Sequence, residues 1–278
     1  MNRDFLDLRI DLRERRAPYA LATVVEVLGS SSASAGSMAI IDGHGTLLAG
    51  WVGGGCAEGM VRQAAVDCLK QGAPTMIDLD LNDEIFGAGM PCGGSMRVFI
   101  DPVMPAPRLW LFGHGLIGES LCSLGAMLGF EVMVIDSLAR PDRFPGARRV
   151  INDDVSYRQA TAVAGDFAVV ATHHKGDYAA IRRLLRTDIR FIALVASRRR
   201  ARLVLRRLLE EGIEGTDLAR VRAPAGLAIG ARTPEEIALA IIAEIVMVRR
   251  GGQGVAKRDL AAGTAEAAAD VPATPSHS

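Results

Sequence analysis

Two cysteines of this chain lie among glycines, in surroundings that suit a ligand-binding thiol. Gly53, Gly54 and Gly55 precede Cys56, and Gly93 and Gly94 follow Cys92. Glycine adopts backbone conformations that other residues avoid, and its lack of a side chain lets a ligand come close. For either cysteine alone, a structural interpretation as a small residue in a tight turn stays open. The pair, with similar surroundings, favours a binding site.

A helix is predicted to begin at Cys56 and to stop at Gly72. The dipole and the free N–H groups of a helix N-terminus stabilise a thiolate, so the Cys56 thiol would ionise more easily than a free thiol. Glu58 lies in the first turn, where a carboxylate suits the dipole; it could also be a base or a polar contact beside the thiol. Cys68, on the apolar face of this helix, is predicted to be a packing residue, as is Cys122 on a later helix.

A second glycine motif follows a predicted strand and opens a predicted helix. It consists of Gly113, His114, Gly115, Leu116, Ile117 and Gly118. Such a turn lets the backbone approach a pyrophosphate, which the helix N-terminus then attracts. Asp136 ends the next strand, 21 residues after Gly115, where an acidic residue can bond a ribose diol. The motif predicts a nucleotide site, although a scaffold that binds no dinucleotide stays an open alternative. Arg140 nearby could contact a 2′-phosphate, so the choice between NAD and NADP stays open.

Two histidines follow the fourth predicted strand of the second half. His173 and His174 come directly after Thr172, at the edge where ligands bind in open α/β sheets. Adjacent histidines point in different directions, so a shared metal is not expected without further ligands. A contact from His173 to a ligand is one interpretation, and a polar turn leading to a helix capped by Asp177 is the other.

The predicted elements of the first half mix strands with two helices. Phe5, Leu8 and Leu12 share one face of an opening helix, and the Cys56 helix is the second. This mixture predicts a compact α+β domain. The strands are predicted at 19–28, 37–42, 46–52, 75–81 and 95–100.

The second half alternates strands and helices, which predicts a mostly parallel sheet with helices on both faces. Thr233 and Glu236 form a capping box at the start of the final helix. The strands are predicted at 108–112, 131–136, 148–151, 167–172 and 191–196, and the helices at 116–128, 156–162, 177–186, 198–211 and 234–249.

The fold class predicted is therefore α/β, with a small α+β domain followed by a Rossmann-like domain. A proline-rich stretch from Asp101 to Pro107 marks the boundary between them. The predicted division is a cysteine-containing domain at 1–102, a linker at 103–107, a Rossmann-like domain at 108–250 and a disordered tail at 251–278.

Composition excludes several classes of protein. Lys+Arg and Asp+Glu both number 32, so no net charge attracts nucleic acid or an anionic membrane. The arginines from Arg198 to Arg207 are expected to form a solvated helix face, or else to meet an acidic partner or a ligand phosphate. No stretch resembles a signal peptide or a membrane span. Four cysteines in 278 residues indicate free thiols in a reducing cytoplasm.

In combination, these motifs resemble the XdhC/CoxI family of molybdenum-hydroxylase accessory factors. The matching segments, in order, are Gly29-Ser30-Ser31, Gly36-Ser37-Met38, Gly53 to Glu58, Cys92 to Gly94, Gly113 to Gly115, Asp136, Thr172-His173, Ser197 to Arg200, Ala223 to Ala231 and Thr233 to Ala238. They extend over about residues 17 to 250, which makes the resemblance more specific than any one motif.

The resemblance implies a maturation chaperone more than a catalyst. Such proteins bind the molybdenum cofactor, support its sulfurated form and deliver it to an apo-enzyme of the xanthine dehydrogenase class, with a cysteine desulfurase and a homodimer as further expected partners. Cys56 and Cys92 are then expected to contact the metal or dithiolene end of the cofactor, because thiolates match soft centres. Gly53 to Gly55 would hold an anionic group.

Two departures from the family pattern bear on that expectation. The family usually has Pro-Arg after its Gly-Ser-Ser, where this chain has Ser32 and Ala33. Near the C-terminus the usual Pro-Ile-Gly-Leu reads Pro224-Ala225-Gly226-Leu227, a milder change. Two alternatives remain: an NAD(P)-dependent oxidoreductase, with His173 as its proton-transfer candidate, and a nucleotide-sensing regulatory protein.

Overall fold

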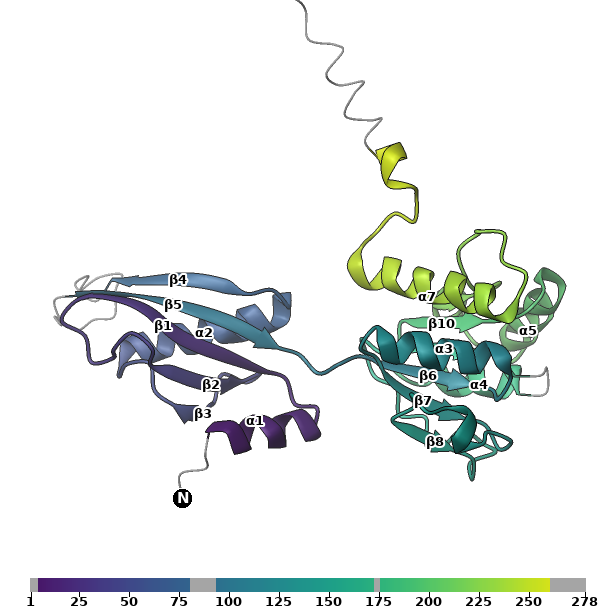
Figure 1. The fold of residues 1–278 in the computed structure, drawn as a ribbon, viewed down its shortest axis with the longest axis horizontal. Helices are drawn as coiled ribbons and strands as arrows, with labels where there is room; N and C mark the ends of the chain where they lie inside the picture. The colour runs from purple at the N-terminus through teal and green to yellow at the C-terminus, as the bar shows by residue number, and fades with distance from the viewer. Residues whose placement is uncertain (1–4, 81–93, 173–175, 261–278) are drawn as a thin grey trace, which may run out of the picture. The chain divides into compact units, whose positions relative to one another are not determined.

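The structure is a computed structural model that describes residues 5–80, 94–172 and 176–260, with only the backbone described at Cys56. The chain divides into two compact units, Met1–Ala106 and Pro107–Ser278 (Figure 1). This division falls inside the segment 103–107 that the sequence assigns to a linker. No helix in the described ranges is long and apolar enough to cross a membrane.

The first unit is built on an antiparallel sheet with the strand order β3-β2-β1-β5-β4. Helix α2 covers one face, where Val61, Ala65 and Cys68 join the strand residues in a buried core. Helix α1 packs Leu8 and Leu12 on part of the other face. The elements are α1 (Phe5–Glu14), β1 (Tyr19–Gly29), β2 (Met38–Asp42), β3 (Leu47–Gly50), α2 (Cys56–Gln71), β4 (Thr75–Asp80) and β5 (Gly94–Val103).

Strand β5 is longer than the sequence predicts, because it continues through Asp101 and Pro102 to Val103. Strand β4 pairs with β5 only as far as Ile100, so beyond that point β5 has β1 as its single neighbour. Proline is tolerated at such an edge because its missing N–H costs no ladder bond. The proline-rich stretch therefore begins inside the sheet and not after it.

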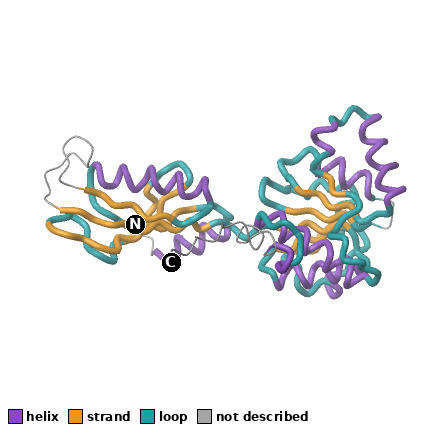
Figure 2. The backbone as a smooth tube through the Cα atoms, turned by 90° about the horizontal axis from the view of Figure 1, so that it is seen from above, coloured by secondary structure: helices purple, strands orange, loops and turns teal. Residues whose placement is uncertain are grey.

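The second unit is built on a parallel sheet with the strand order β11-β10-β9-β6-β7-β8. Helices α3 and α7 pack on one face, and α4 and α5 on the other. The tube view shows helices on both sides of the strands of this unit (Figure 2). The predicted fold class is confirmed. The elements are β6 (Arg108–Phe112), α3 (Leu116–Met127), β7 (Glu131–Ile135), η1 (Pro141–Arg143), β8 (Arg149–Ile151), β9 (Phe167–Val170), α4 (Asp177–Leu184), β10 (Phe191–Leu194), α5 (Arg198–Glu210), α6 (Gly215–Leu218), β11 (Val221–Arg222) and α7 (Pro234–Arg250).

The predicted helix at 156–162 is wrong, since this segment forms turns. The Asp154 carboxylate accepts hydrogen bonds from the backbone N–H groups of Ser156 and Gln159, and Tyr157 has a positive φ of 57°. The Arg183 guanidinium, on α4, then donates to the carbonyl oxygen of Tyr157 and to two more carbonyls of the segment. Side chains thus take the backbone groups that a helix would have paired with one another.

The two ends of α7 form as the sequence predicts. The Thr233 hydroxyl accepts from the Glu236 N–H while the Glu236 carboxylate accepts from the Thr233 N–H, which completes the capping box. Gly251 ends the helix in the left-handed conformation. Residues 251–260 are exposed. Most of the predicted disordered tail, 261–278, lies outside the described residues.

Candidate functional site

Three motif segments of the first unit meet at one end of its sheet. Gly94, the first residue of β5, lies opposite Gly29, the last residue of β1. A Cβ at Gly94 would come within 2.5 Å of the Ser30 carbonyl oxygen, so the loop after β1 lies directly on this position. The same loop reaches the glycine turn before α2, where the Gly54 N–H donates to the Ser32 hydroxyl at 3.4 Å. The fold therefore brings the glycine motifs of the first unit together.

The glycine turn presents backbone at the N-terminus of α2. Gly53 and Gly55 have positive φ values of 109° and 61°, which side-chain-bearing residues rarely adopt. A Cβ at Gly54 would meet nothing within 4 Å, so that position faces open space. Gly55 is the N-cap of α2 and brings no side-chain oxygen to its first N–H groups. Such a turn can hold an anionic group through main-chain donors and the helix dipole.

The structure describes the side chains of the two cysteines that are predicted to pack. Cys68 and Cys122 are free and buried, as predicted for packing residues, and the Cys68 thiol donates to the Ile100 carbonyl. Burial raises the pKa of the Cys122 thiol to about 11. Cys56 is the first residue of α2, while Cys92 and Gly93 lie outside the described residues.

Glu58 is engaged within its own helix. Its carboxylate lies 3.5 Å from the Arg62 guanidinium one turn later. Arg62 also donates to the carbonyl oxygen of Gly45, which ties α2 to the loop between β2 and β3. This arrangement favours the structural interpretation of Glu58 over that of a base beside the thiol.

In the second unit, the glycine motif lies where the strand order reverses direction. Strand β6 has β7 on one side and β9 on the other, and ligands of open α/β sheets bind at the carboxyl ends of such strands. Gly113 has a φ of 135°, and a Cβ there would collide with the Ala171 carbonyl after β9. Gly115 is the N-cap of α3. A Cβ at Gly118 would lie 3.4 Å from the Gly113 oxygen, so Gly118 serves helix–turn packing.

Gly113→Ala is expected to lower the free energy of unfolding of the second unit by about 3 kcal/mol. The methyl group would add a collision with backbone to the cost of the backbone conformation. Gly129→Ala is the matched control, since Gly129 also has a positive φ of 79° but has open space around its Cβ position. The control should lose only about 1 kcal/mol. Equal losses for the two variants in urea unfolding would show that the close approach at Gly113 is unimportant.

Asp136 is held by the glycine motif itself. The His114 Nδ1 lies 3.0 Å from the Asp136 Oδ1, which also accepts from the Leu138 N–H at 2.9 Å. Asp136 is buried, with 8% of its surface exposed. A hollow of about 310 Å³ lies beside this pair. It is lined by His114, Gly115, Leu116, Glu119, Leu138, Arg140 and Arg143.

A buried polar cluster at the same edge was missed by sequence reasoning. Asp177 is fully buried, and its carboxylate accepts from the Thr172 hydroxyl and from the Arg200 Nε at 2.7 Å. The Thr172 hydroxyl accepts from the Gly176 N–H, so the predicted polar turn into α4 is present. Asp177 is the first residue of α4 and not its cap, while His173 lies outside the described residues. In the sequence, this cluster could have been found from an acidic residue and an arginine at the starts of two successive helices.

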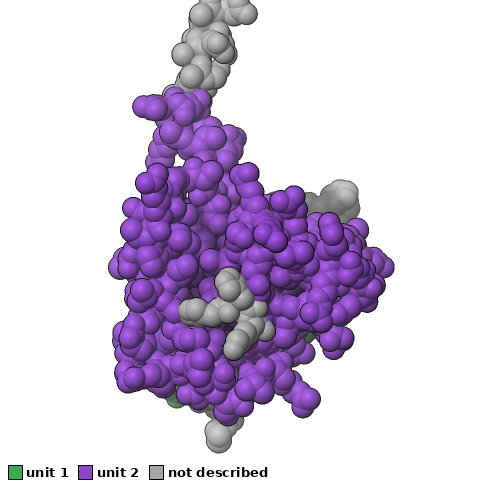
Figure 3. Space-filling view, turned by 90° about the vertical axis from the view of Figure 1, so that its right-hand side faces the viewer, with its two compact units in different colours: residues 1–106 green, residues 107–278 purple. Residues whose placement is uncertain are grey.

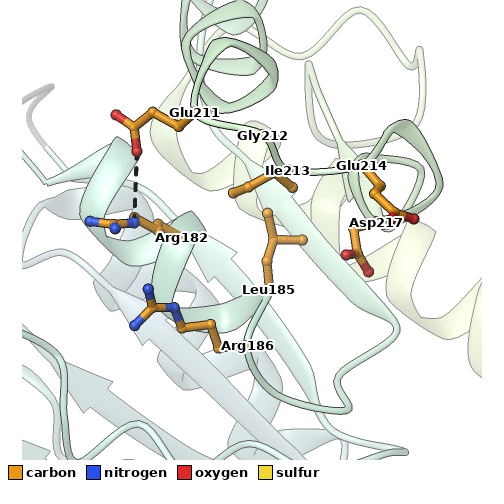
Figure 4. A pocket seen from close by; sticks show the side chains of 8 residues that line it. All are labelled: Arg182, Leu185, Arg186, Glu211, Gly212, Ile213, Glu214 and Asp217. Carbon is orange, nitrogen blue, oxygen red and sulfur yellow. Dashed lines mark ion pairs between the residues drawn. The ribbon is translucent and has the colours of Figure 1, made fainter.

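A second hollow of the second unit lies away from the glycine motif. It measures about 350 Å³ and lies between the end of α4 and the loop after α5, where Arg182 faces Glu211 at 3.8 Å (Figure 4). Helix α4 leads into β10, and α5 leads through α6 into β11, so the hollow lies at the amino-terminal edge of the parallel sheet. It is therefore remote from the carboxyl-edge loops. Its charged lining consists of Arg182, Arg186, Glu211, Glu214 and Asp217.

Within the described ranges, no group of three or more His, Cys, Asp or Glu side chains could hold a metal ion. That statement does not reach Cys56 and Cys92, whose side chains are not described. The predicted metal ligands therefore stay a prediction.

The chain is similar to proteins of known families along most of its length. The model of the XdhC and CoxI family matches residues 12–80, and that of the XdhC Rossmann domain matches residues 109–245. The protein YqeB of Escherichia coli (strain K12) is 31% identical over 250 residues, which cover 87% of this chain and 46% of YqeB. A probable xanthine dehydrogenase subunit of Bacillus subtilis (strain 168) is 34% identical over 160 residues, 55% of this chain and 46% of that protein.

The chain thus spans about half the length of these two relatives. A third relative matches over most of its own length: the molybdenum cofactor insertion chaperone PaoD of Escherichia coli (strain K12) is 21% identical over 281 residues, 82% of this chain and 83% of PaoD. The two family models account for both units in the order in which they occur. The chain belongs to the XdhC and CoxI family.

Proposed function

We propose that the protein binds the molybdenum cofactor, supports its sulfuration and delivers it to an apo molybdenum hydroxylase of the xanthine dehydrogenase class. The observation that carries this proposal is the meeting of the family's glycine segments at one end of the first unit's sheet, at Gly29, Gly54 and Gly94. The likeness to a molybdenum cofactor insertion chaperone over four-fifths of both chains supports it.

The residues of the first unit suit such a cargo. Thiolates from Cys56 and Cys92 would bind its soft metal or dithiolene end. The turn from Gly53 to Gly55 would hold its phosphate through main-chain N–H groups at the start of α2, in the open space that glycine leaves at position 54. Gly93 and Gly94 would let the backbone beside Cys92 come close to the same ligand.

The departure from the family's Pro-Arg pair has a structural counterpart. Ala33 stands where the arginine is usual, and its side chain is buried. Ser32 accepts from the Gly54 N–H and so supports the glycine turn from outside. In this chain, the remaining main-chain donors of the turn and of the start of α2 would therefore hold the anionic group without a guanidinium.

The second unit supports a second candidate, the binding of a nucleotide. The turn of Gly113, His114 and Gly115 with Gly118 behind it, and the hollow of about 310 Å³ with Arg140 on its rim, are where the adenosine half of NAD(P) would lie. Asp136 would reach a ribose only with its remaining acceptor capacity, because its Oδ1 already accepts from Leu138 and pairs with His114. Nucleotide binding without turnover would fit a sensing role, whereas turnover with His173 as the proton-transfer group would make the protein a dehydrogenase.

The remaining parts of the proposal concern partners and place. We propose an apo hydroxylase as the client, a cysteine desulfurase as the sulfur source, a homodimer as the working form and the cytoplasm as the compartment. Each follows from the function proposed for the family.

The experiment that tests the proposal is anaerobic purification from cells that synthesise the cofactor. We expect molybdenum and a pterin to copurify in similar molar amounts, measured by metal analysis and mass spectrometry of the released ligand. Protein that carries neither under these conditions would contradict the proposal. Nicotinamide-dependent turnover by the same preparation would support the oxidoreductase alternative.

A further inference from the structure

Within the described part of the chain, the protein engages one oxygen of the Asp136 carboxylate. Both of its interactions use Oδ1, which lies 3.0 Å from the His114 Nδ1 and accepts from the Leu138 N–H at 2.9 Å. His114 and Leu138 also line the hollow of about 310 Å³ at the start of α3. Oδ2 is thus the acceptor left for a ligand. A carboxylate at this place, after the strand that follows the glycine motif, suits the hydroxyls of a ribose.

The two arginines that line the same hollow are each held by a carboxylate. The Arg140 Nε and Nη2 donate to the two carboxylate oxygens of Asp142, at 3.2 and 2.9 Å. The Arg143 Nη2 lies 2.8 Å from the Glu119 carboxylate, which belongs to the lining as well. The bidentate pair occupies the edge of the Arg140 guanidinium that would otherwise bind two phosphate oxygens.

The charges around the hollow therefore disfavour a second phosphate beside the ribose. The three carboxylates of Asp136, Asp142 and Glu119 outnumber the two guanidinium groups. A 2′-phosphate would bring a charge of about −1.5 to −2 close to Asp136. Because only 8% of Asp136 is exposed, water screens that repulsion poorly. A ribose with free hydroxyls adds no charge and can donate to the carboxylate.

We infer that the second unit binds a nucleotide whose adenosine ribose is unphosphorylated, NAD and not NADP, and that Asp142 sets this preference together with Asp136. Asp136 accepts from the ribose and repels a 2′-phosphate. Asp142 acts through Arg140, as a positioning residue, because it keeps the guanidinium from offsetting that repulsion. The inference rests on the second candidate function, nucleotide binding, and not on the binding of the molybdenum cofactor.

The test measures the affinities of the full-length protein for NAD⁺ and for NADP⁺ by isothermal titration calorimetry. The unaltered protein should bind NAD⁺ at least about tenfold more tightly, since a charge-assisted hydrogen bond to the ribose is worth about that factor. Asp136→Ala should weaken NAD⁺ binding about tenfold. Asp142→Ala should shift the ratio of the two affinities about fivefold toward NADP⁺, which is what an exposed ion pair can withhold from a phosphate.

Asp259→Ala is the matched control. Asp259 also lies beside an arginine, at 3.5 Å from the Arg258 Nε, and its side chain is 62% exposed against 60% for Asp142. It does not line the hollow, so its removal should leave the ratio of affinities unchanged. Because the Asp142 side chain is exposed, the Asp142→Ala result decides the case even where Asp136→Ala fails to fold.

Three results would overturn the inference while nucleotide binding stands. They are equal binding of NADP⁺ and NAD⁺ by the unaltered protein, a ratio that Asp142→Ala leaves unchanged, and full NAD⁺ affinity in a folded Asp136→Ala variant. Binding of neither dinucleotide would overturn the inference and the nucleotide function together. That result would leave the proposed binding of the molybdenum cofactor standing, since the cofactor is measured separately as molybdenum and pterin.

Discussion

Replacing Asp177 with alanine is expected to lower the free energy of unfolding of the second unit by about 3 kcal/mol. Asp177 is fully buried and accepts hydrogen bonds from the Thr172 hydroxyl and the Arg200 guanidinium. Removing the carboxylate takes an acceptor from the buried Thr172 hydroxyl and one partner from the Arg200 guanidinium, whose side chain is 31% exposed. The largest part of the cost is expected at the buried positions, where the hydroxyl has lost its water and the carboxylate leaves an unfilled space.

The measurement uses the chain's two tryptophans. Trp51 lies in the first unit and Trp110 is buried in the second, so Trp110 fluorescence in a Trp51→Phe background reports on the unit of interest. Asp142→Ala is the control. Its carboxylate pairs with Arg140 at 2.9 Å, but both side chains are largely exposed, and such pairs contribute less than about 1 kcal/mol. Similar losses of unfolding free energy in both variants would mean that the burial of Asp177 does not determine how much it stabilises the second unit.

Asp177 also connects the loops at the carboxyl edge. Thr172 follows β9, and Arg200 lies in the first turn of α5, which follows β10. A single carboxylate thus joins the ends of two neighbouring strands to the start of α4. Figure 3 shows one face of this unit in purple, in space-filling form. Loss of the Asp177 carboxylate would let these loops move. The side chains that a ligand at this edge would contact would move with them.

The fold was predictable where local sequence and burial agree. The strand 108–112 is found at the predicted residues, because an unbroken apolar run between a proline stretch and a glycine motif suits a strand buried on both faces. The final helix begins at its capping box for a similar reason. Prediction failed at 156–162, where polar side chains and the distant Arg183 set the backbone. No local periodicity reports such a contact.

The candidate site was predictable in its glycines but not in its buried polar residues. Gly113 and Gly53 are visible in the sequence because a turn with positive φ requires them. The role of Asp177 can be seen only once the strand order places the ends of β6 and β9 at one edge. In the sequence, Arg200 is one of several arginines on a helix face expected to be solvated. Its partner lies 23 residues away, and only the fold brings the two together.

The largest functional effect is expected from removing the two glycine-flanked thiols. The double variant Cys56→Ala, Cys92→Ala should retain at most about a tenth of the molybdenum that the unaltered protein carries after anaerobic purification, since one lost charge-assisted contact alone is worth about tenfold. Each single variant should retain an intermediate amount, because a soft metal centre loses one of two thiolate contacts. Pterin released from the same samples should fall in parallel if the thiols hold the intact cofactor.

Cys68→Ala separates this effect from a general loss of thiols. Cys68 lies in the same unit and on the same helix as Cys56, but it is buried, and burial raises the pKa of its thiol. A protonated thiol in the core cannot bind a metal, so this variant should retain its cofactor and lose only a small amount of stability. Molybdenum content in the double variant equal to that of Cys68→Ala would remove the two glycine-flanked cysteines from the binding site. The glycine turn at Gly53 to Gly55 would then have to hold the cofactor by its anionic group alone, and retention would fall as the salt concentration rises.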